Sequence, residues 1–296
     1  MHITFRQLHA FRTIATLGQV QLAAKQLHLS QPATSMALSE LEKNLGCQLF
    51  DRVGNRLLLN SQGQKLLPLA SELLDRNNEI AQLFTQDDCH TGKLMIGAST
   101  TIGNYLLPEE LATFGKANPK VTIALEIQNT TTIIERLAAL EIDLACVEGP
   151  CQHPEIEAIP WMEDELTVFC APEHPLAQME SLTTAQLEEA EWILRETGSG
   201  TRMLFELHIG QHLRQRNLKM ELNQTEAIKS MVRSGFGISW LSTLCLGKEL
   251  EKGELVRLPV QLPERQKKRS FWILLNKNKY RSTAVNRFLE GLLVLM

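Results

Sequence analysis

The apolar positions between residues 20 and 46 repeat with the period of short helices. The pattern predicts an alanine-rich helix from Val20 to Leu27, a tight connection, and a second helix that begins after Ser30. Ser30 is a favourable N-cap residue, and Pro32 fits the first turn, where its missing N–H costs nothing. The apolar positions are Leu22, Ala23 and Leu27 in the first helix and Thr34, Leu38, Leu41 and Leu45 in the second, which stops at Gly46.

Uncharged side chains that are small or form hydrogen bonds occupy the other face of the second helix. They are Gln31, Ala33, Ser35, Met36 and Ser39. Such side chains at the start of a helix can approach base edges in the major groove of DNA. Because helix pairs of this kind also occur without DNA contact, an ordinary amphipathic pair with a solvated face is the alternative.

The segments on either side favour the DNA-binding interpretation. Residues 4–17 predict a further helix whose core-facing side holds Phe5, Leu8, Phe11, Ile14 and Ala15. After Gly46, two short strands enclose a turn at residues 54–55, with Arg52 and Arg56 near its tip. Such a β-wing suits contact with phosphates or insertion into the minor groove, and a plain hairpin with exposed arginines is the alternative.

A long helix is predicted from Ser61 to Asp88. Its apolar positions alternate by four and three, which is the spacing of a heptad seam. A polar residue on such a seam, here Asn77, can fix the register and the number of helices that associate. We expect a dimerising linker helix, and a helix packed on its own domain is the alternative. The seam comprises Leu66, Ala70, Leu73, Asn77, Ile80 and Phe84.

From Lys93 onward, runs typical of strands alternate with runs typical of helices. Strands at 93–99, 121–128 and 143–149 enclose helices at 102–117 and 130–141, and this order predicts a parallel sheet covered by helices. A second run follows, with predicted strands at 165–172, 192–196, 219–223, 237–242, 255–260 and 269–276. Its predicted helices lie at 183–190, after 198–202, at 226–234 and at 282–293.

The charge of the chain is unevenly distributed. The net charge is −4, but residues 1–66 contain seven Lys and Arg against three Asp and Glu, a net +4 that leaves −8 for the rest. A basic N-terminal module on an acidic body suits specific DNA binding. The N-terminus has no apolar core of a signal sequence, and no stretch approaches the roughly 20 apolar residues of a membrane span, so we expect a cytoplasmic protein without a membrane partner.

The sequence contains no pattern of a metal site or of an enzyme. The six cysteines are scattered, without a CxxC pair or a histidine at ligand spacing, so we expect no metal, no cofactor and buried, reduced thiols. Cys151 follows Gly149-Pro150 and is the cysteine most open to exposure. Residues 198–202, GSGTR, lack the spacing of a nucleotide loop, and neither a Ser/His/Asp set nor a carboxylate pair stands out.

Four predicted loops rich in hydroxyls and glycine lie where strands lead into helices. In an open α/β sheet these loops meet at one edge, and helix starts offer N–H groups and a positive dipole end to an anion. Each loop taken singly also fits ordinary N-capping, but their coincidence predicts a site for a small anion or carboxylate. The loops are residues 98–104, 128–132, 195–202 and 223–226, with 148–150 beside them.

The N-terminal segments resemble those of LysR-type transcriptional regulators. The resemblance rests on FRQLHAFRTIATLG, QLAAKQL, LSQPATS, LSELEKNLGCQLFDR and LNSQGQKLL, in the order and spacing of that family. It departs from the family at Thr34, where an aliphatic residue is more frequent. The resemblance implies DNA binding by a dimer through Ser30, Gln31, Pro32, Ala33 and Ser35, with Arg52 and Arg56 on the DNA backbone.

The same resemblance implies the organisation of the whole chain. We expect an α plus α/β fold: a winged helix-turn-helix DNA-binding domain (1–60), a dimerising linker helix (61–89) and a two-lobed α/β effector-binding domain (90–296) like periplasmic solute-binding proteins. Lobe I would comprise about 92–164 and 268–296, and lobe II about 165–267, so that the last strand and helix return to lobe I. The family also implies a homotetramer on double-stranded promoter DNA, in which the ligand reorients the lobes and so changes the spacing of the DNA-binding heads.

The C-terminal part resembles the branch of that family that senses inorganic sulfur oxyanions, the YeiE- and CysL-like regulators. The runs that carry it are STTIGNYLLP, VEGPC, WILRETGSGTR and TEAIKSMVRSGFGIS. It implies a small anion such as sulfite or sulfate in the inter-lobe cleft. Glu148 would accept a proton from the ligand or pair with Arg195 or Arg202. The candidate ligands are Ser99, Thr100, Thr101, Asn129, Glu148, Arg195, Ser199, Gly200 and Thr201.

Two other functions remain as alternatives. A regulator of the same class could respond to an amino acid or an aromatic carboxylate, which would need a larger and more apolar cleft. A pure solute-binding module fits the C-terminal part, but it does not explain the basic head or the absence of a signal sequence. We therefore expect a DNA-binding regulator, not an enzyme.

Overall fold

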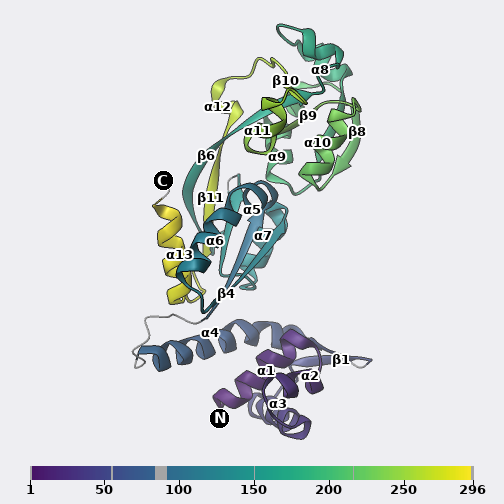
Figure 1. Ribbon diagram of the computed structural model, residues 1–296. Coiled ribbons are helices and arrows are strands. Elements are labelled where there is room, and N and C mark those ends of the chain that lie inside the picture. The colour runs from purple at the N-terminus through teal and green to yellow at the C-terminus, as the bar shows by residue number, and fades with distance from the viewer. Residues whose placement is uncertain (1, 55, 84–91, 150, 216, 295–296) are drawn as a thin grey trace. The chain divides into compact units, whose positions relative to one another are not determined.

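The computed structural model describes residues 2–54, 56–83, 92–149, 151–215 and 217–294 (Figure 1). The chain divides into two compact units, residues 1–92 and 93–296, each of which has its own hydrophobic core. We call them the head and the effector unit. None of the helices within the described ranges combines the length and the hydrophobicity that spanning a bilayer requires.

The head contains three short helices, a two-stranded hairpin and a long helix. The helices are α1 (Phe5–Leu17), α2 (Val20–Gln26), α3 (Gln31–Leu45) and α4 (Ser61–Leu83), and the hairpin is β1 (Phe50–Val53) with β2 (Arg56–Leu59). The α2–turn–α3 pair followed by this hairpin is the expected winged helix-turn-helix. The Ser30 hydroxyl caps α3 by accepting from the N–H of Ala33, and Gly46 ends the helix with φ at 71°.

The head core confirms most of the predicted stripes and corrects two positions. Leu8, Phe11 and Ile14 of α1 are fully enclosed, whereas Phe5 is 48% exposed at the start of the helix. In α2 the buried residues are alanines, and Leu22 faces solvent. A seven-residue helix buries only a narrow strip, and here it lies along the alanines.

Thr34 lies fully buried in the apolar stripe of α3 without leaving its hydroxyl unpaired. Its Oγ1 donates to the main-chain oxygen of Ser30, one turn earlier, at 3.2 Å. A buried hydroxyl costs little free energy when it is hydrogen-bonded. This bond explains how a threonine replaces an aliphatic residue in the core of the head.

Helix α4 divides its apolar side chains between the head core and solvent. Asn60 caps it, because the Asn60 Oδ1 accepts from the N–H groups of Gln62 and Gly63 at 3.0 Å. Along the expected seam Ala70 is buried in the head core, together with Leu74 one position off it, while Leu73 and Ile80 are exposed. The helix therefore packs on its own domain and also presents an apolar face. Phe84, Asp88 and the expected linker at 87–91 lie outside the described residues.

The first lobe of the effector unit contains strands β3 (Gly92–Ser99), β4 (Val121–Gln128) and β5 (Leu144–Glu148) and helices α5 (Thr100–Tyr105), α6 (Leu107–Ala117) and α7 (Thr130–Ala138). Strands β3 and β5 pair in parallel, as predicted. The single helix expected at 102–117 is wrong: it breaks at Leu106. Pro108 lies in the first turn of α6, and a proline cannot continue the hydrogen-bonding of a preceding helix.

Two long strands connect the lobes. β6 (Ile156–Cys170) pairs antiparallel with β11 (Lys268–Asn276) (Figure 1). The seven-stranded sheet has the order β10-β6-β11-β5-β3-β4, with β9 also on β6. β11 also pairs antiparallel with β5, and α13 (Thr283–Leu293) packs into the same core as β3 and β5. The last strand and helix therefore return to the first lobe. Strand β6 begins nine residues earlier than the predicted 165–172, and its register shifts beside Pro160, where a bulge accommodates the missing N–H.

The second lobe surrounds a core formed by Trp192, Phe205 and Trp240. Its predicted strands and helices are present, while α11 and α12 are not among the predicted helices. The elements are η1 (Pro175–Gln178), α8 (Thr184–Glu189), β7 (Glu191–Arg195), α9 (Gly200–His208), η2 (Gly210–His212), β8 (Asn217–Leu222), α10 (Thr225–Arg233), β9 (Ser239–Ser242), α11 (Thr243–Glu251), β10 (Val256–Arg257) and α12 (Glu264–Lys267).

The substitution Gly63→Ala tests how closely α4 packs against the rest of the head. A Cβ at this position would lie 2.2 Å from the main-chain oxygen of Leu49, so we expect Gly63→Ala to destabilise the head by about 1–3 kcal/mol. Gly247 in α11 has no atom within 4 Å of its Cβ position, and Gly247→Ala is expected to be neutral or stabilising by about 0.5–1 kcal/mol. Urea unfolding followed by circular dichroism measures both, and equal stability of the two variants would contradict this packing.

Candidate functional site

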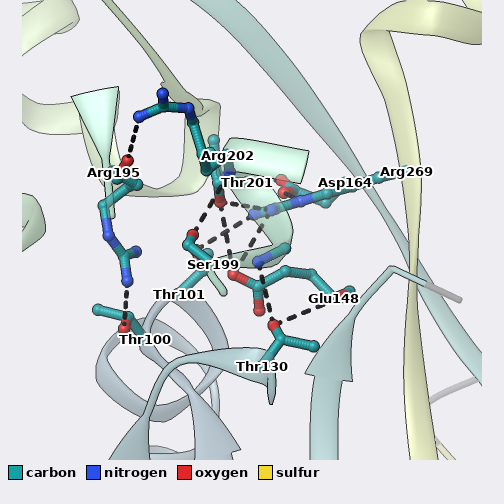
Figure 2. Close-up of polar contacts among 12 residues, drawn as sticks. Thr100, Thr101, Thr130, Glu148, Asp164, Arg195, Ser199, Thr201, Arg202 and Arg269 are labelled. Carbon is teal, nitrogen blue, oxygen red and sulfur yellow. Dashed lines mark hydrogen bonds and ion pairs between the residues drawn. The ribbon is translucent and has the colours of Figure 1, made fainter. Parts of the chain in front are cut away.

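Three of the four predicted anion loops, 98–104, 128–132 and 195–202, meet with Glu148 in one buried cluster of the effector unit. Ser99 and Glu148 end strands β3 and β5 in the first lobe, and Arg195 ends β7 in the second. Figure 2 shows Thr100 and Thr101 of α5 beside Arg195, Thr201 and Glu148. Ser99, Thr100, Thr101, Glu148, Arg195, Ser199 and Thr201 are each at most 5% exposed. The fold therefore brings side chains from both lobes into a shared polar interior.

Arg195 connects the two lobes and keeps one donor atom unused. Its Nη2 donates to the Thr100 hydroxyl at 3.0 Å, and its Nε and Nη2 bind the two carboxylate oxygens of Glu196 at 2.8 and 2.9 Å. The remaining nitrogen, Nη1, is buried and has no hydrogen-bond partner among the described residues. A buried guanidinium nitrogen without an acceptor is costly, so it marks a place where an acceptor is expected.

A second arginine, Arg269 of β11, lies at the centre of the cluster. Its Nε binds Asp164 of β6 at 2.6 Å, and Nη1 lies 3.6 Å from Glu148 Oε1. Its other bonds go to hydroxyls of both lobes, from Nη1 to Thr201 at 2.8 Å and from Nη2 to Thr101 at 3.2 Å (Figure 2). One guanidinium therefore holds a carboxylate on each side and one hydroxyl from each lobe.

The partners of Glu148 differ from both ion pairs expected for it. Arg195 pairs with Glu196, and Arg202 pairs with Glu206 and Glu221 while donating to the Arg195 main-chain oxygen, so neither reaches Glu148. Glu148 faces Arg269 instead. Sequence reasoning missed Arg269 and Asp164, because cross-strand neighbours 105 residues apart form no local pattern.

Asn129, Ser199 and Gly200 hold the loops rather than present unused groups. Asn129 caps α7 through the Thr132 N–H at 3.0 Å, and Ser199 caps α9 through the Arg202 N–H at 3.4 Å. The Gly200 N–H donates to the Thr130 hydroxyl, and a Cβ on Gly200 would lie 2.5 Å from the Glu148 main-chain oxygen. A glycine is therefore required where α9 begins against the end of β5.

Three buried polar atoms of the cluster have no hydrogen-bond partner among the residues that the structure describes. They come from the ends of β3, β5 and β7. Because unpaired buried polar atoms are rare in folded proteins, three of them at these strand ends point to a ligand. They are Ser99 Oγ, Glu148 Oε2 and Arg195 Nη1.

The side chains expected to contact DNA are placed on the surface of the head. Ser30, Gln31, Pro32 and Ser35 are exposed and Ala33 is half-buried, at the start of α3. Arg52 and Arg56 are exposed in the hairpin, where Arg52 lies opposite Leu57 and Arg56 opposite Val53. Opposed residues share a face of an antiparallel pair, so the two arginines leave opposite faces. Asn55 of the turn lies outside the described residues.

The described cysteines are unpaired thiols, and the described part of the chain has no group of three or more side chains that could hold a metal. Burial raises the pKa of the Cys170 and Cys245 thiols to about 12, and raises that of Cys146 further. Burial also raises the pKa of Cys151, which is half-buried. Thiols in this state are poor nucleophiles. Cys89 and Pro150 lie outside the described residues.

Two family models and a relative match this chain. Residues 5–64 match the family described as bacterial regulatory helix-turn-helix protein, lysR family, and residues 88–294 match the LysR substrate binding domain. The HTH-type transcriptional regulator YeiE of Escherichia coli K12, itself described as uncharacterized, is 43% identical over 290 residues, 98% of this chain and 97% of YeiE.

Two solved structures extend this comparison. A full-length OxyR variant of Pseudomonas aeruginosa matches with a TM-score of 0.76 at 23% identity and covers 100% of this chain and 95% of its own. The regulatory domain of CcmR from Synechocystis PCC6803, in complex with 2-PG, matches with a TM-score of 0.63 at 29% identity, over 69% of this chain and 97% of its own. The fold of both units is thus shared with known structures.

The central role of Arg269 predicts a large loss of stability when it is removed. Arg269→Leu leaves the buried carboxylates of Asp164 and Glu148 without their cation, which costs about 3–5 kcal/mol. Adding Asp164→Leu removes one of the two unpaired buried charges and should restore part of the lost stability. Arg257→Leu breaks an exposed pair with Glu165 and should cost at most about 1 kcal/mol. Urea unfolding measures these differences, and an Arg269→Leu protein as stable as the Arg257→Leu control would contradict the arrangement.

Proposed function

We propose that this chain, which belongs to the LysR family of bacterial DNA-binding transcriptional regulators, responds to a small oxyanion bound between the lobes of its effector domain. Sulfite and sulfate are the favoured ligands. The family and the YeiE relative are regulators rather than enzymes. The observation that carries the proposal is the buried, unpaired Nη1 of Arg195, which lies in the same cluster as the unpaired Ser99 Oγ.

The chemistry of these atoms suits an anion with few atoms. An arginine nitrogen and a hydroxyl donate to anion oxygens, and hydrogen bonds to a charged acceptor are the stronger ones. Because the surrounding side chains are almost fully buried, the site favours a tetrahedral or pyramidal oxyanion over a bulky organic acid.

A second candidate effector is an organic acid. The CcmR regulatory domain, 29% identical to this chain, was solved in complex with 2-PG. An amino acid or an aromatic carboxylate would use the same arginine but would need the lobes further apart than they are here. Direct comparison of ligands of different size separates the two candidates.

The head is proposed to bind DNA through α3 and the wing. Ser30, Gln31 and Ser35 point from the exposed start of α3 and suit base edges, with Pro32 and Ala33 making close apolar contact. Arg52 and Arg56 leave opposite faces of the hairpin, which suits contact with the two backbones that border one groove.

The apolar face of the head is proposed to bind a second copy of the chain. Leu69, Leu73 and Ile80 of α4 are exposed, and a hollow of about 160 Å³ lies beside them, lined by Ile3, Phe5, Leu8, Leu66, Leu69, Ala70 and Leu73. An exposed apolar face along a helix is typical of an association surface. Dimers joined here, and tetramers formed from them, would let ligand binding alter the spacing of the heads, provided the ligand binds one arrangement more tightly.

The effector proposal predicts a ligand-dependent gain in thermal stability of the full-length protein. A ligand at 100 times its dissociation constant should stabilise the effector unit by about 2.7 kcal/mol. We expect this gain in stability with sulfite or sulfate. We expect Arg195→Lys to lose it, since lysine keeps the charge but cannot bind Thr100 and the anion through two separate nitrogens. Arg257→Lys, on the exposed surface, serves as the control. Stabilisation by organic acids alone would overturn the oxyanion and keep the regulator.

The DNA proposal predicts different effects for the helix and the wing. On DNA selected by the protein from a random-sequence pool, Arg52→Ala should weaken binding to all sequences alike and reduce the salt slope by about 1. Gln31→Ala should mainly reduce the preference for the selected sequence, by about 1–3 kcal/mol. Arg233→Ala, in the effector unit, is the control. Unchanged binding by both head variants would contradict this interface.

A further inference from the structure

The two oxygens of the Glu148 carboxylate have different environments. Oε1 accepts from the hydroxyls of Thr101 and Thr201, both at 3.4 Å, and faces Arg269 Nη1 at 3.6 Å. Oε2 is buried and has no hydrogen-bond partner among the described residues. The side chain is 1% exposed, so solvent does not satisfy Oε2.

The directions of these bonds are fixed by Arg269. A guanidinium only donates, so the Thr101 and Thr201 hydroxyls accept from Arg269 and direct their own protons to Glu148 Oε1. Oε1 is thereby committed as an acceptor for both lobes. A further group that donates to Glu148 therefore has Oε2 as its free acceptor.

Each cation of the cluster is already paired with another carboxylate, so none is left to neutralise Glu148 alone. Arg269 of β11 is shared with Asp164 of β6, and Arg195 of β7 is bound by Glu196. Cys245 of α11 also lies close, and burial raises the pKa of its thiol to about 12, so it is neutral. An anion oxygen without a proton would thus meet a carboxylate oxygen with nothing between them, which is repulsive.

We propose that Glu148 selects oxyanions that carry a proton. This inference rests on the proposed function, in which the anion accepts from Arg195 Nη1 and Ser99 Oγ. Its protonated oxygen then donates to Glu148 Oε2. Hydrogen sulfite and monohydrogen phosphate meet this requirement at neutral pH, whereas sulfate has no proton to donate.

The selection has a consequence for the pH dependence of binding. Hydrogen sulfite loses its proton near neutral pH. The apparent affinity for total sulfite should therefore fall by about tenfold for each pH unit above the pKa of hydrogen sulfite. Sulfate is unprotonated throughout this range, so of the two favoured anions it should bind less tightly than hydrogen sulfite and stabilise the protein only at a higher concentration. The pH dependence of binding arises from titration of the ligand, because only the protonated ligand can donate to Glu148 Oε2.

Glu148→Gln provides the test. Its amide oxygen should take the place of Oε1, because Thr101, Thr201 and Arg269 all point donors at that position, and the amide NH₂ would then face the site as a donor. We expect the variant to bind sulfate at least tenfold more tightly than the wild type does, and its sulfite affinity to lose most of the pH dependence. Calorimetric titration of the full-length protein with sulfite, phosphate and sulfate between pH 6 and 8.5 measures both.

Glu163→Gln is the matched control, because Glu163 is exposed and pairs only weakly across the surface with Lys268. The wild-type titrations test the proposal even if Glu148→Gln does not fold. Equal wild-type affinity for sulfate and sulfite, or a sulfite affinity independent of pH, would overturn proton selection and leave the anion site in place. Binding of none of the three anions would overturn the oxyanion site as well.

Discussion

The effector unit depends on the buried pair of Arg269 and Asp164. The two residues are directly opposed on β11 and β6, the strands that run between the lobes, and their side chains are each 1% exposed. Burying two charges is rarely favourable by itself, so the pair is better understood by what it positions. It holds Arg269 where its other nitrogens bind Thr101 of the first lobe, Thr201 of the second and, at longer range, Glu148.

This arrangement couples the binding site to the geometry of the lobes. Glu148 belongs to the first lobe, yet one of its oxygens is held by hydroxyls from both. Arg195 belongs to the second lobe and binds Thr100 of the first. A ligand that engages the unused atoms of these two side chains acts on contacts common to both lobes, and it shifts their arrangement only by as much as it prefers one arrangement over another.

Local chemistry made much of this fold predictable from sequence. The Ser30 cap, the Gly46 stop and the alternating strands of the first lobe each depend on neighbours within a few residues. Pro108 carried the information that breaks the predicted helix at Leu106, but the apolar pattern around it outweighed it. The loops of Ser99 and Glu148 were predictable as neighbours because β3 and β5 are parallel strands of one sheet, whereas Arg195, expected at the same edge, ends β7 of a separate sheet. Arg269 and Asp164 were not, since long-range pairing alone joins them.

The proposed function depends on a small oxyanion bound between the lobes beside Arg195. Crystals of the full-length protein grown with selenite, whose selenium scatters anomalously, test it most directly. We expect one strong anomalous peak in each effector unit, with anion oxygens within hydrogen-bond distance of Arg195 Nη1, Ser99 Oγ and Glu148 Oε2. A peak elsewhere, or none at that position in well-ordered crystals, would contradict it.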